Sequence, residues 1–207
     1  MGSRIMHLVI ANRIAENLSM KDRTLFLLGS IAPDAVSSKD LSHFFIGDVQ
    51  DFSRSVDYQS FLEKYRSQAD SPYIRGYYTH LIADDVWLRG FNLPWLRNRM
   101  EADKELSNLY YHDFWLLNGK LLEYYSFTDE LRKVLSVVPE VLELEEVTSK
   151  EVHEFLPCVL DDMNYDTEMM KENLNVFTFT QMVGYIETCV ELGTFHIQRI
   201  NEAKRVR

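Results

Sequence analysis

The chain has 207 residues, of which 46% are hydrophobic and 26% charged, a balance that suits a globular domain with its own core. Glycine (8) and proline (5) are scarce, which favours long helices over a turn-rich β fold. The formal net charge of −10 argues against non-specific nucleic-acid binding through a basic surface. It leaves room for a nucleotide in a metal-lined cleft, because the ion supplies the positive charge. We expect an all-α fold, a single helical bundle over 1–207.

Apolar periodicity and capping signals predict helices along most of the chain. They are expected over residues 3–18, 21–28, 59–66, 72–89, 94–100, 104–125, 128–137, 149–163 and 178–205. Gly29 and Gly90 are expected to end the helices that precede them, and Pro157 to interrupt its own. Residues 32–56 are polar and turn-rich, which predicts a loop that covers the helices. No β-hairpin signal is visible.

The sequence carries no signal for secretion or membrane insertion. Polar residues interrupt the first apolar stretch, and no stretch reaches the roughly 18 apolar residues needed to span a bilayer. The two cysteines have no partner at metal-ligand spacing, which is typical of free thiols in a reducing compartment. We therefore expect a cytoplasmic protein.

His80 and Asp84 lie four residues apart on the best-defined predicted helix. That spacing places both side chains on one face, within reach of one ion. Such a pair alone is more often a hydrogen bond or a helix salt bridge. Apolar residues surround this pair, however, and a buried carboxylate is costly unless it is paired or binds a cation.

Three earlier residues each have an ordinary explanation when considered singly. His7 lies in an apolar stretch and suits a hydrogen-bonded core histidine. Asp34, after Pro33, suits a turn or cap, and His43 suits a loop histidine. Together the three precede the His80–Asp84 pair in a recognisable order.

That order is His7, then Pro33-Asp34, then Ser42-His43-Phe44, then His80-x-x-x-Asp84. It resembles the zinc-dependent phospholipase C family and, more distantly, the zinc-dependent nucleases that cut single strands. The segments 3–7 and 27–34 look especially like small bacterial members. The resemblance covers roughly 1–125, so this part is expected to carry the site and 126–207 to form a helical packing region.

The resemblance implies an all-α, phospholipase C-like or nuclease-like fold with one to three zinc ions. By analogy Asp34, His43, His80 and Asp84 hold one ion, and Asp84 bridges to a second that His7 also binds. The family's later His-x-x-x-Glu is missing here, which favours one or two ions over three.

Late candidates for the site are His112-Asp113, His153 and His196. Small family members carry Tyr-x-x-Asp before Leu-Asn, a pattern that Tyr110 and Asp113 match, so Asp113 is predicted to be an inward ligand or base. The adjacent His112-Asp113 pair also resembles the His-Asp metal phosphohydrolases, although the small residues usual after that dyad are absent. His153 is expected to be exposed, and His196 to be a core or surface histidine.

Metal-assisted hydrolysis of a phosphoester is the function that these residues favour. Zinc or a similar divalent ion would activate water, and a second ion, Asp34 or Asp113 would orient that water. The substrate is expected to be a phospholipid or a small soluble phosphoester. A structural or sensory metal site without turnover is the alternative, and a helical interaction protein without metal is a third possibility.

Overall fold

The computed structural model describes residues 3–21, 23–137 and 139–205, and it confirms the all-α class. The first helix, α1 (Arg4–Asn17), begins where the sequence predicts, because the Ser3 hydroxyl accepts a hydrogen bond from the Met6 amide. Ten of its residues are buried, among them His7. The polar imidazole therefore lies in the centre of the bundle.

Helices α2 (Thr24–Ile31) and α5 (Pro72–Trp87) pack together through a pair of glycines. A Cβ added at Gly29 would overlap the carbonyl group of Tyr73, and one added at Gly76 would overlap that of Phe26. The prediction that Gly29 ends its helix is therefore wrong. Gly29 lies inside α2, where its missing side chain allows the two backbones to come close.

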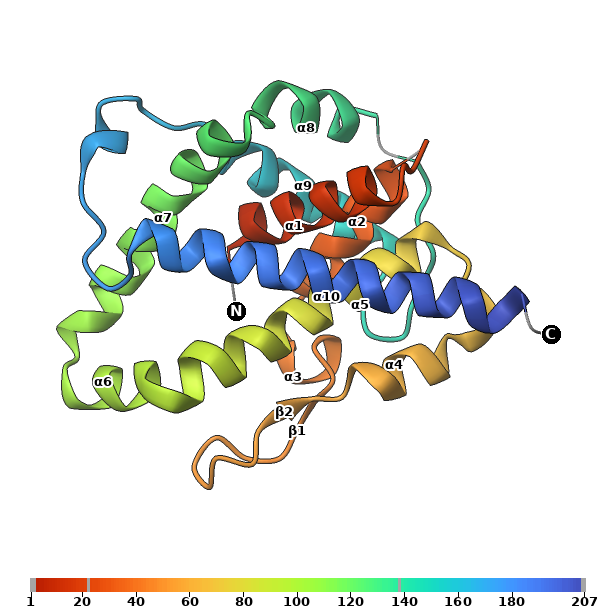
Figure 1. Cartoon of the computed structure of the whole chain (residues 1–207), viewed down its shortest axis with the longest axis horizontal. Coiled ribbons are helices and arrows are strands. Elements are labelled where there is room, and N and C mark those ends of the chain that lie inside the picture. Colours follow the sequence, from red (N-terminus) through yellow and green to blue (C-terminus); the bar gives the residue numbers. More distant parts are fainter. Residues whose placement is uncertain (1–2, 22, 138, 206–207) are drawn as a thin grey trace.

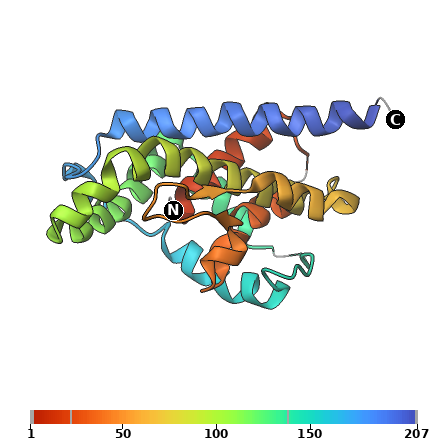
Figure 2. The ribbon, with the colours of Figure 1, turned by 90° about the horizontal axis from the view of Figure 1, so that it is seen from below.

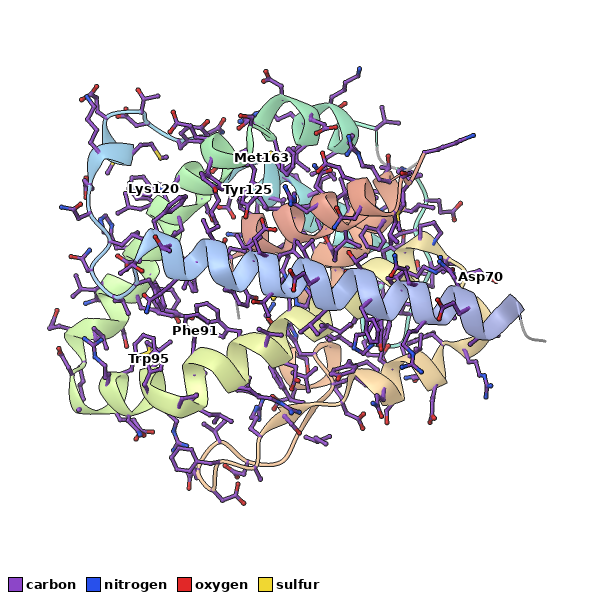
Figure 3. The ribbon with its side chains drawn as sticks, viewed as in Figure 1. Asp70, Phe91, Trp95, Lys120, Tyr125 and Met163 are labelled. Atoms are coloured by element: carbon purple, nitrogen blue, oxygen red, sulfur yellow. The ribbon has the colours of Figure 1, made fainter. Side chains whose placement is uncertain are left out.

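Helix α5 does not stop at Gly90 as predicted. It continues into a π-helix, η3 (Leu88–Leu96), and then into α6 (Arg97–Ala102). Pro94 lies inside the π-helix, whose wider hydrogen-bond pattern tolerates a residue that lacks an N–H. Phe91 and Trp95 extend from this segment (Figure 3), and Phe91 stacks on Trp87 with ring centroids 4.7 Å apart.

The predicted loop over 32–56 contains more regular structure than expected. It includes η1 (Ala32–Ala35), α3 (Lys39–Ser42) and a short antiparallel hairpin of β1 (Phe45–Ile46) and β2 (Ser55–Val56). The hairpin escaped prediction because two-residue strands are too short to show alternation. Its loop projects from the edge of the molecule (Figure 1).

The remaining helices complete the bundle. They are α4 (Tyr58–Lys64), η2 (Arg66–Gln68), α7 (Glu105–Tyr125), α8 (Thr128–Leu135), α9 (Ser149–Asp161), η4 (Met169–Lys171) and α10 (Phe179–Arg205). Pro157 lies within α9 and does not interrupt it, contrary to the prediction. Helix α10 packs on α1 and α5 and covers one side of the bundle, while α9 lies on the opposite side (Figure 2). Within the described ranges, no helix is long and apolar enough to cross a membrane.

Candidate metal centre

The five side chains expected to bind metal meet inside the bundle. His7 comes from α1 and Asp34 from η1, His43 follows α3, and His80 and Asp84 lie on α5. Their ligand atoms form two groups in which all atoms lie within 4.8 Å of one another. One group is His43, His80 and Asp84, and the other is His7, Asp34 and His80. Because His80 belongs to both groups, the five residues form one continuous cluster.

The His80 ring is oriented by the end of α2. Its Nδ1 lies 2.7 Å from the carbonyl oxygen of Ser30, which can only accept a hydrogen bond, so Nδ1 carries the proton. Ser30 is in the last turn of α2, where carbonyls lack an amide partner four residues on, and Pro33 has no N–H to donate. The Nε2 lone pair of a neutral His80 therefore faces the cluster.

Hydrogen bonds also orient the ring of His43 and set its tautomer. The Ser42 hydroxyl donates its proton to the carbonyl oxygen of Pro33 at 2.8 Å, so it accepts from Nδ1 of His43 at 2.9 Å. Tyr77 in turn donates to the Ser42 carbonyl oxygen at 2.6 Å and holds this turn against α5. His43 thus also presents the Nε2 lone pair to the cluster.

These two lone pairs face each other across a short gap. The Nε2 atoms of His43 and His80 are 3.3 Å apart, and Oδ2 of Asp84 lies 3.4 Å and 3.7 Å from them. Two nitrogens bound tetrahedrally at about 2.0–2.1 Å to one zinc ion are ~3.3 Å apart. Facing lone pairs beside a carboxylate repel one another unless a cation lies between them. The donor set therefore fits a metal ion, and the cluster is able to hold one.

Asp84 divides its two oxygens between different imidazoles. While Oδ2 faces His43 and His80, Oδ1 lies 3.5 Å from Nε2 of His7. The His7 ring stacks on His80 with centroids 3.7 Å apart, and in the described part of the chain neither of its nitrogens has a hydrogen-bond partner. A buried imidazole without such a partner is costly, and ligation of a metal removes that cost.

The protonation states also suit metal binding. Burial opposes the charge on Asp84, but the positive charge around it, together with the adjacent imidazole of His7, outweighs burial and keeps the pKa of this carboxyl well below its usual range. Burial is similarly outweighed at Asp34, where the nearby imidazoles of His43, 3.6 Å away, and His80 keep the pKa well below the usual range. For His80, burial and the neighbouring His7 lower the pKa well below its usual value. At neutral pH the site thus offers two carboxylates and a neutral imidazole, the forms that bind metals.

Asp34 is the member of the cluster that solvent reaches. Its side chain is 16% exposed, whereas those of His7, His43, His80 and Asp84 are at most 2% exposed. Lys39 donates to Oδ1 of Asp34 at 2.9 Å. Both residues line a cleft of about 680 Å³, so the cluster borders an accessible cavity through Asp34.

Asp113 does not join the cluster, although its side chain is fully buried as predicted. Its Oδ1 accepts hydrogen bonds from the amide and side chain of Asn175, and its Oδ2 from the amides of Val176 and Phe177, at 2.7–3.2 Å. Both oxygens therefore fasten the segment before α10 to α7. This corrects the expected ligand or base role: Asp113 has a structural one.

The late histidines also lie elsewhere. His112 pairs with Glu172 at 3.1 Å, His153 is exposed and bonds the Ser149 carbonyl, and His196 lies 3.0 Å from the Tyr78 hydroxyl. Within the described residues, the two groups of ligand atoms include none of these three histidines. These three histidines therefore lie apart from the cluster in the described part of the chain.

The groups that orient the cluster side chains by hydrogen bonds were not predicted from the sequence. Ser30, Ser42 and Lys39 act through a carbonyl, a hydroxyl and an ammonium group. Serine and lysine at these positions carry no metal-ligand signal, and a backbone carbonyl carries none at all. Only the fold reveals that they face the cluster.

Comparison with protein-family models, with curated proteins and with solved structures gives no match to this chain. The assignment of function therefore depends on the geometry of the site and on the sequence resemblance described above.

Proposed function

We propose that this protein is a metal-dependent phosphoester hydrolase, with the site built from His7, Asp34, His43, His80 and Asp84. The observation that carries the proposal is the pair of Nε2 atoms, 3.3 Å apart, that His43 and His80 direct at each other beside the Asp84 carboxylate. A cation bound between the two nitrogens would remove the repulsion of their lone pairs. The resemblance to the zinc-dependent phospholipase C family agrees with this proposal and supplies the reaction class.

Zinc is the proposed ion, because imidazole and carboxylate ligands at these separations suit it. Bound zinc would supply Lewis-acid chemistry, lowering the pKa of water towards about 7 and neutralising phosphate oxygens. Since Asp84 faces His43 and His80 with one oxygen and His7 with the other, the proposal favours two adjacent ions that share this carboxylate.

The remaining residues have distinct tasks in the proposed reaction. Ser30 and Ser42 hold the tautomers of His80 and His43, which keeps both lone pairs on the site. Asp34, at the open edge, orients a water molecule by accepting its hydrogen bond. Its lowered pKa makes it a weak proton acceptor, so we assign it positioning rather than general-base catalysis.

The cleft supports an enzyme over a closed structural site. Structural zinc sites surround the ion with protein ligands, whereas catalytic sites keep one position open. Asp34 opens onto a cleft within the usual range of about 300–1,000 Å³ for ligand pockets. Lys39 and Arg4 line the same cleft, where they pair with Asp34 at 2.9 Å and with Asp162 at 2.6 Å, so the bound ion would supply the net positive charge for a phosphate group.

A non-catalytic metal site is the second candidate, because four of the five ligands are almost completely buried. Metal analysis of the purified protein, together with a screen of phosphodiester and phosphomonoester hydrolysis, separates the candidates. Bound zinc with turnover supports the hydrolase, and bound zinc without turnover on any phosphoester supports the structural or sensory site. Absence of any bound metal in zinc-supplemented protein would refute both.

The sharpest variant is Asp84→Asn, with Asp85→Asn as the matched control on the same helix. Asp85 pairs with Arg89 at 2.9 Å, and in the described residues it belongs to neither group of ligand atoms. Asp84→Asn should lose zinc and activity together, while Asp85→Asn keeps both. Full activity in an Asp84→Asn protein with verified metal content would refute the proposed site.

A further inference from the structure

Five aromatic side chains line the cleft. Helix α7 contributes Tyr110, Tyr111, Phe114 and Trp115, and α9 contributes Phe155. Tyr111 and Trp115 are four residues apart on one face of α7, with 68% and 44% of their surfaces exposed. Large rings left open to solvent inside a cleft are suited to contact a ligand.

An unsatisfied polar group lies beside these rings. Asn118 follows Trp115 by three residues on the same face of α7 and lines the same cleft. It is only 6% exposed, and its Oδ1 has no hydrogen-bond partner among the described residues. Leaving a buried acceptor unpaired costs roughly 1–3 kcal/mol. Because Oδ1 is itself buried, the amide of Asn118 would have to turn towards the cleft to accept a hydrogen bond from a ligand N–H group, which would remove this cost.

We infer that the cleft binds the base of a small nucleotide, with the base against Tyr111 and Trp115 and the phosphate directed to the metal cluster. This inference rests on the proposed function and names its substrate class. Nucleobases combine a flat π surface with N–H and acceptor groups at the edge, and an asparagine amide pairs well with such an edge. Because Lys39 and Arg4 pair with Asp34 and Asp162 of the same cleft, the positive charge that attracts the phosphate would come from the metal.

The composition of the wall favours a base over lipid chains. Acyl chains would pack on the aromatic rings, Leu96 and Met100, but they would leave the amide groups of Asn92 and Asn118 in the same cleft without a hydrogen-bond partner. The other lining residues are polar or charged. The net charge of −10 argues against a nucleic-acid polymer, which needs an extended basic surface, so the ligand is a mononucleotide or a similarly small ester.

The test compares two ligands that differ only in the base. Phosphonate analogues of adenosine 5′-monophosphate and ribose 5-phosphate, with a methylene in place of the ester oxygen, resist hydrolysis, so calorimetry of the zinc-loaded protein reports binding alone. We expect the adenosine compound to bind at least about tenfold more tightly, because stacking on aromatic side chains is worth about 1–3 kcal/mol per base. Equal affinity for the two compounds would overturn the inference.

Single substitutions on α7 test which side chains contact the base. Trp115→Ala and Tyr111→Ala should each reduce binding of the adenosine compound severalfold and leave the ribose compound unchanged. Tyr124→Ala is the control, because Tyr124 is 59% exposed on the same helix but lines a different cavity. A uniform loss across all three variants, or tighter binding of a short-chain phosphatidylcholine than of the adenosine compound, would overturn the inference.

Failure of the inference and failure of the proposed function give different results. A protein that hydrolyses phosphoesters without preference for a base retains the function and loses the inference. A protein that binds the adenosine compound through Trp115 but hydrolyses no phosphoester retains the nucleotide site and loses the hydrolase assignment.

Discussion

Replacing Gly76 by alanine should separate α2 from α5 and weaken metal binding without touching a ligand. An added Cβ at Gly76 would lie 2.9 Å from the carbonyl carbon of Phe26, overlap the oxygen of that group, and lie 3.0 Å from the Ser30 amide nitrogen. Carbon atoms in contact are normally about 3.5–4.0 Å apart. The two helices must therefore move apart by at least ~0.6 Å, and by more to clear the oxygen.

Two effects follow from this separation. Overpacking of a core typically costs about 1–3 kcal/mol, and a backbone obstacle that cannot rotate away places this case near ~3 kcal/mol. The hydrogen bond from His80 to the Ser30 carbonyl is now 2.7 Å, and a shift of ~0.8 Å brings it to the limit of hydrogen bonding. Loss of such a supporting bond usually weakens metal affinity by about 10–100-fold.

Urea unfolding of the metal-free protein measures the first effect, and zinc titration in a competing chelator measures the second. Gly184→Ala is the control, because Gly184 lies on α10 with nothing within 4 Å of an added Cβ. That substitution should stabilise the protein by up to ~1 kcal/mol through helix propensity. Unchanged stability and zinc affinity in Gly76→Ala would refute the claim that this helix contact sets the geometry of the site.

Three further outcomes are expected. Asp113→Asn should lower the unfolding free energy by ~3 kcal/mol, since bonds to a charged acceptor are worth about 1.5–3 kcal/mol each. Its zinc content, measured by elemental analysis, should stay unchanged, and zinc loss would restore Asp113 as a ligand. Zinc at ~100 times its dissociation constant should raise the free energy of unfolding by about 2.7 kcal/mol. Calorimetry should then show a Tm roughly 5–11 °C above that of the chelator-treated protein. An unchanged Tm would contradict the metal site. Because the pKa of His80 is lower in the folded than in the unfolded protein, the unfolded state gains protons first on acidification. Urea unfolding of metal-free protein should therefore show stability falling below about pH 6.5, by at most ~1.4 kcal/mol per pH unit, and a flat profile there would contradict this.

The sequence predicts the helices and the ligands of this protein better than the connections between helices. Long periodic segments such as those of α7 and α10 are visible because an apolar face recurs along them. The predictions that Gly29 and Gly90 end their helices are wrong, because glycine, which often ends a helix, also occurs inside one. At Gly29 the reason is the close approach of α5, a tertiary contact that local sequence does not record.

In the candidate site, too, local sequence predicts some features, whereas tertiary contacts decide others. Residue type and spacing suffice to select His80 and Asp84, because the i, i+4 relation fixes both on one face whatever the rest of the fold does. Asp113 has a similar sequence setting, a carboxylate on a helix among apolar residues. What separates it from Asp84 is its partner, the three amides of 175–177, and these are more than 60 residues distant along the chain. The local sequence marks Asp84 by the histidine four residues before it, but it gives no sign of the amides that bind Asp113.

The two halves of the cleft lie on different parts of the bundle, and this separation has a functional consequence. The candidate metal ligands are on α1, η1 and α5 and next to α3, where buried side chains and the Ser30 and Ser42 hydrogen bonds fix their geometry. The aromatic wall is mostly on α7, where the exposed rings of Tyr111 and Trp115 contact Tyr110 and His112 of the same helix. Substitutions on that face of α7 should therefore change which ester is bound without disturbing the ions. Substitutions near Gly76 should do the reverse, weakening the metal centre while leaving the preference among ligands intact.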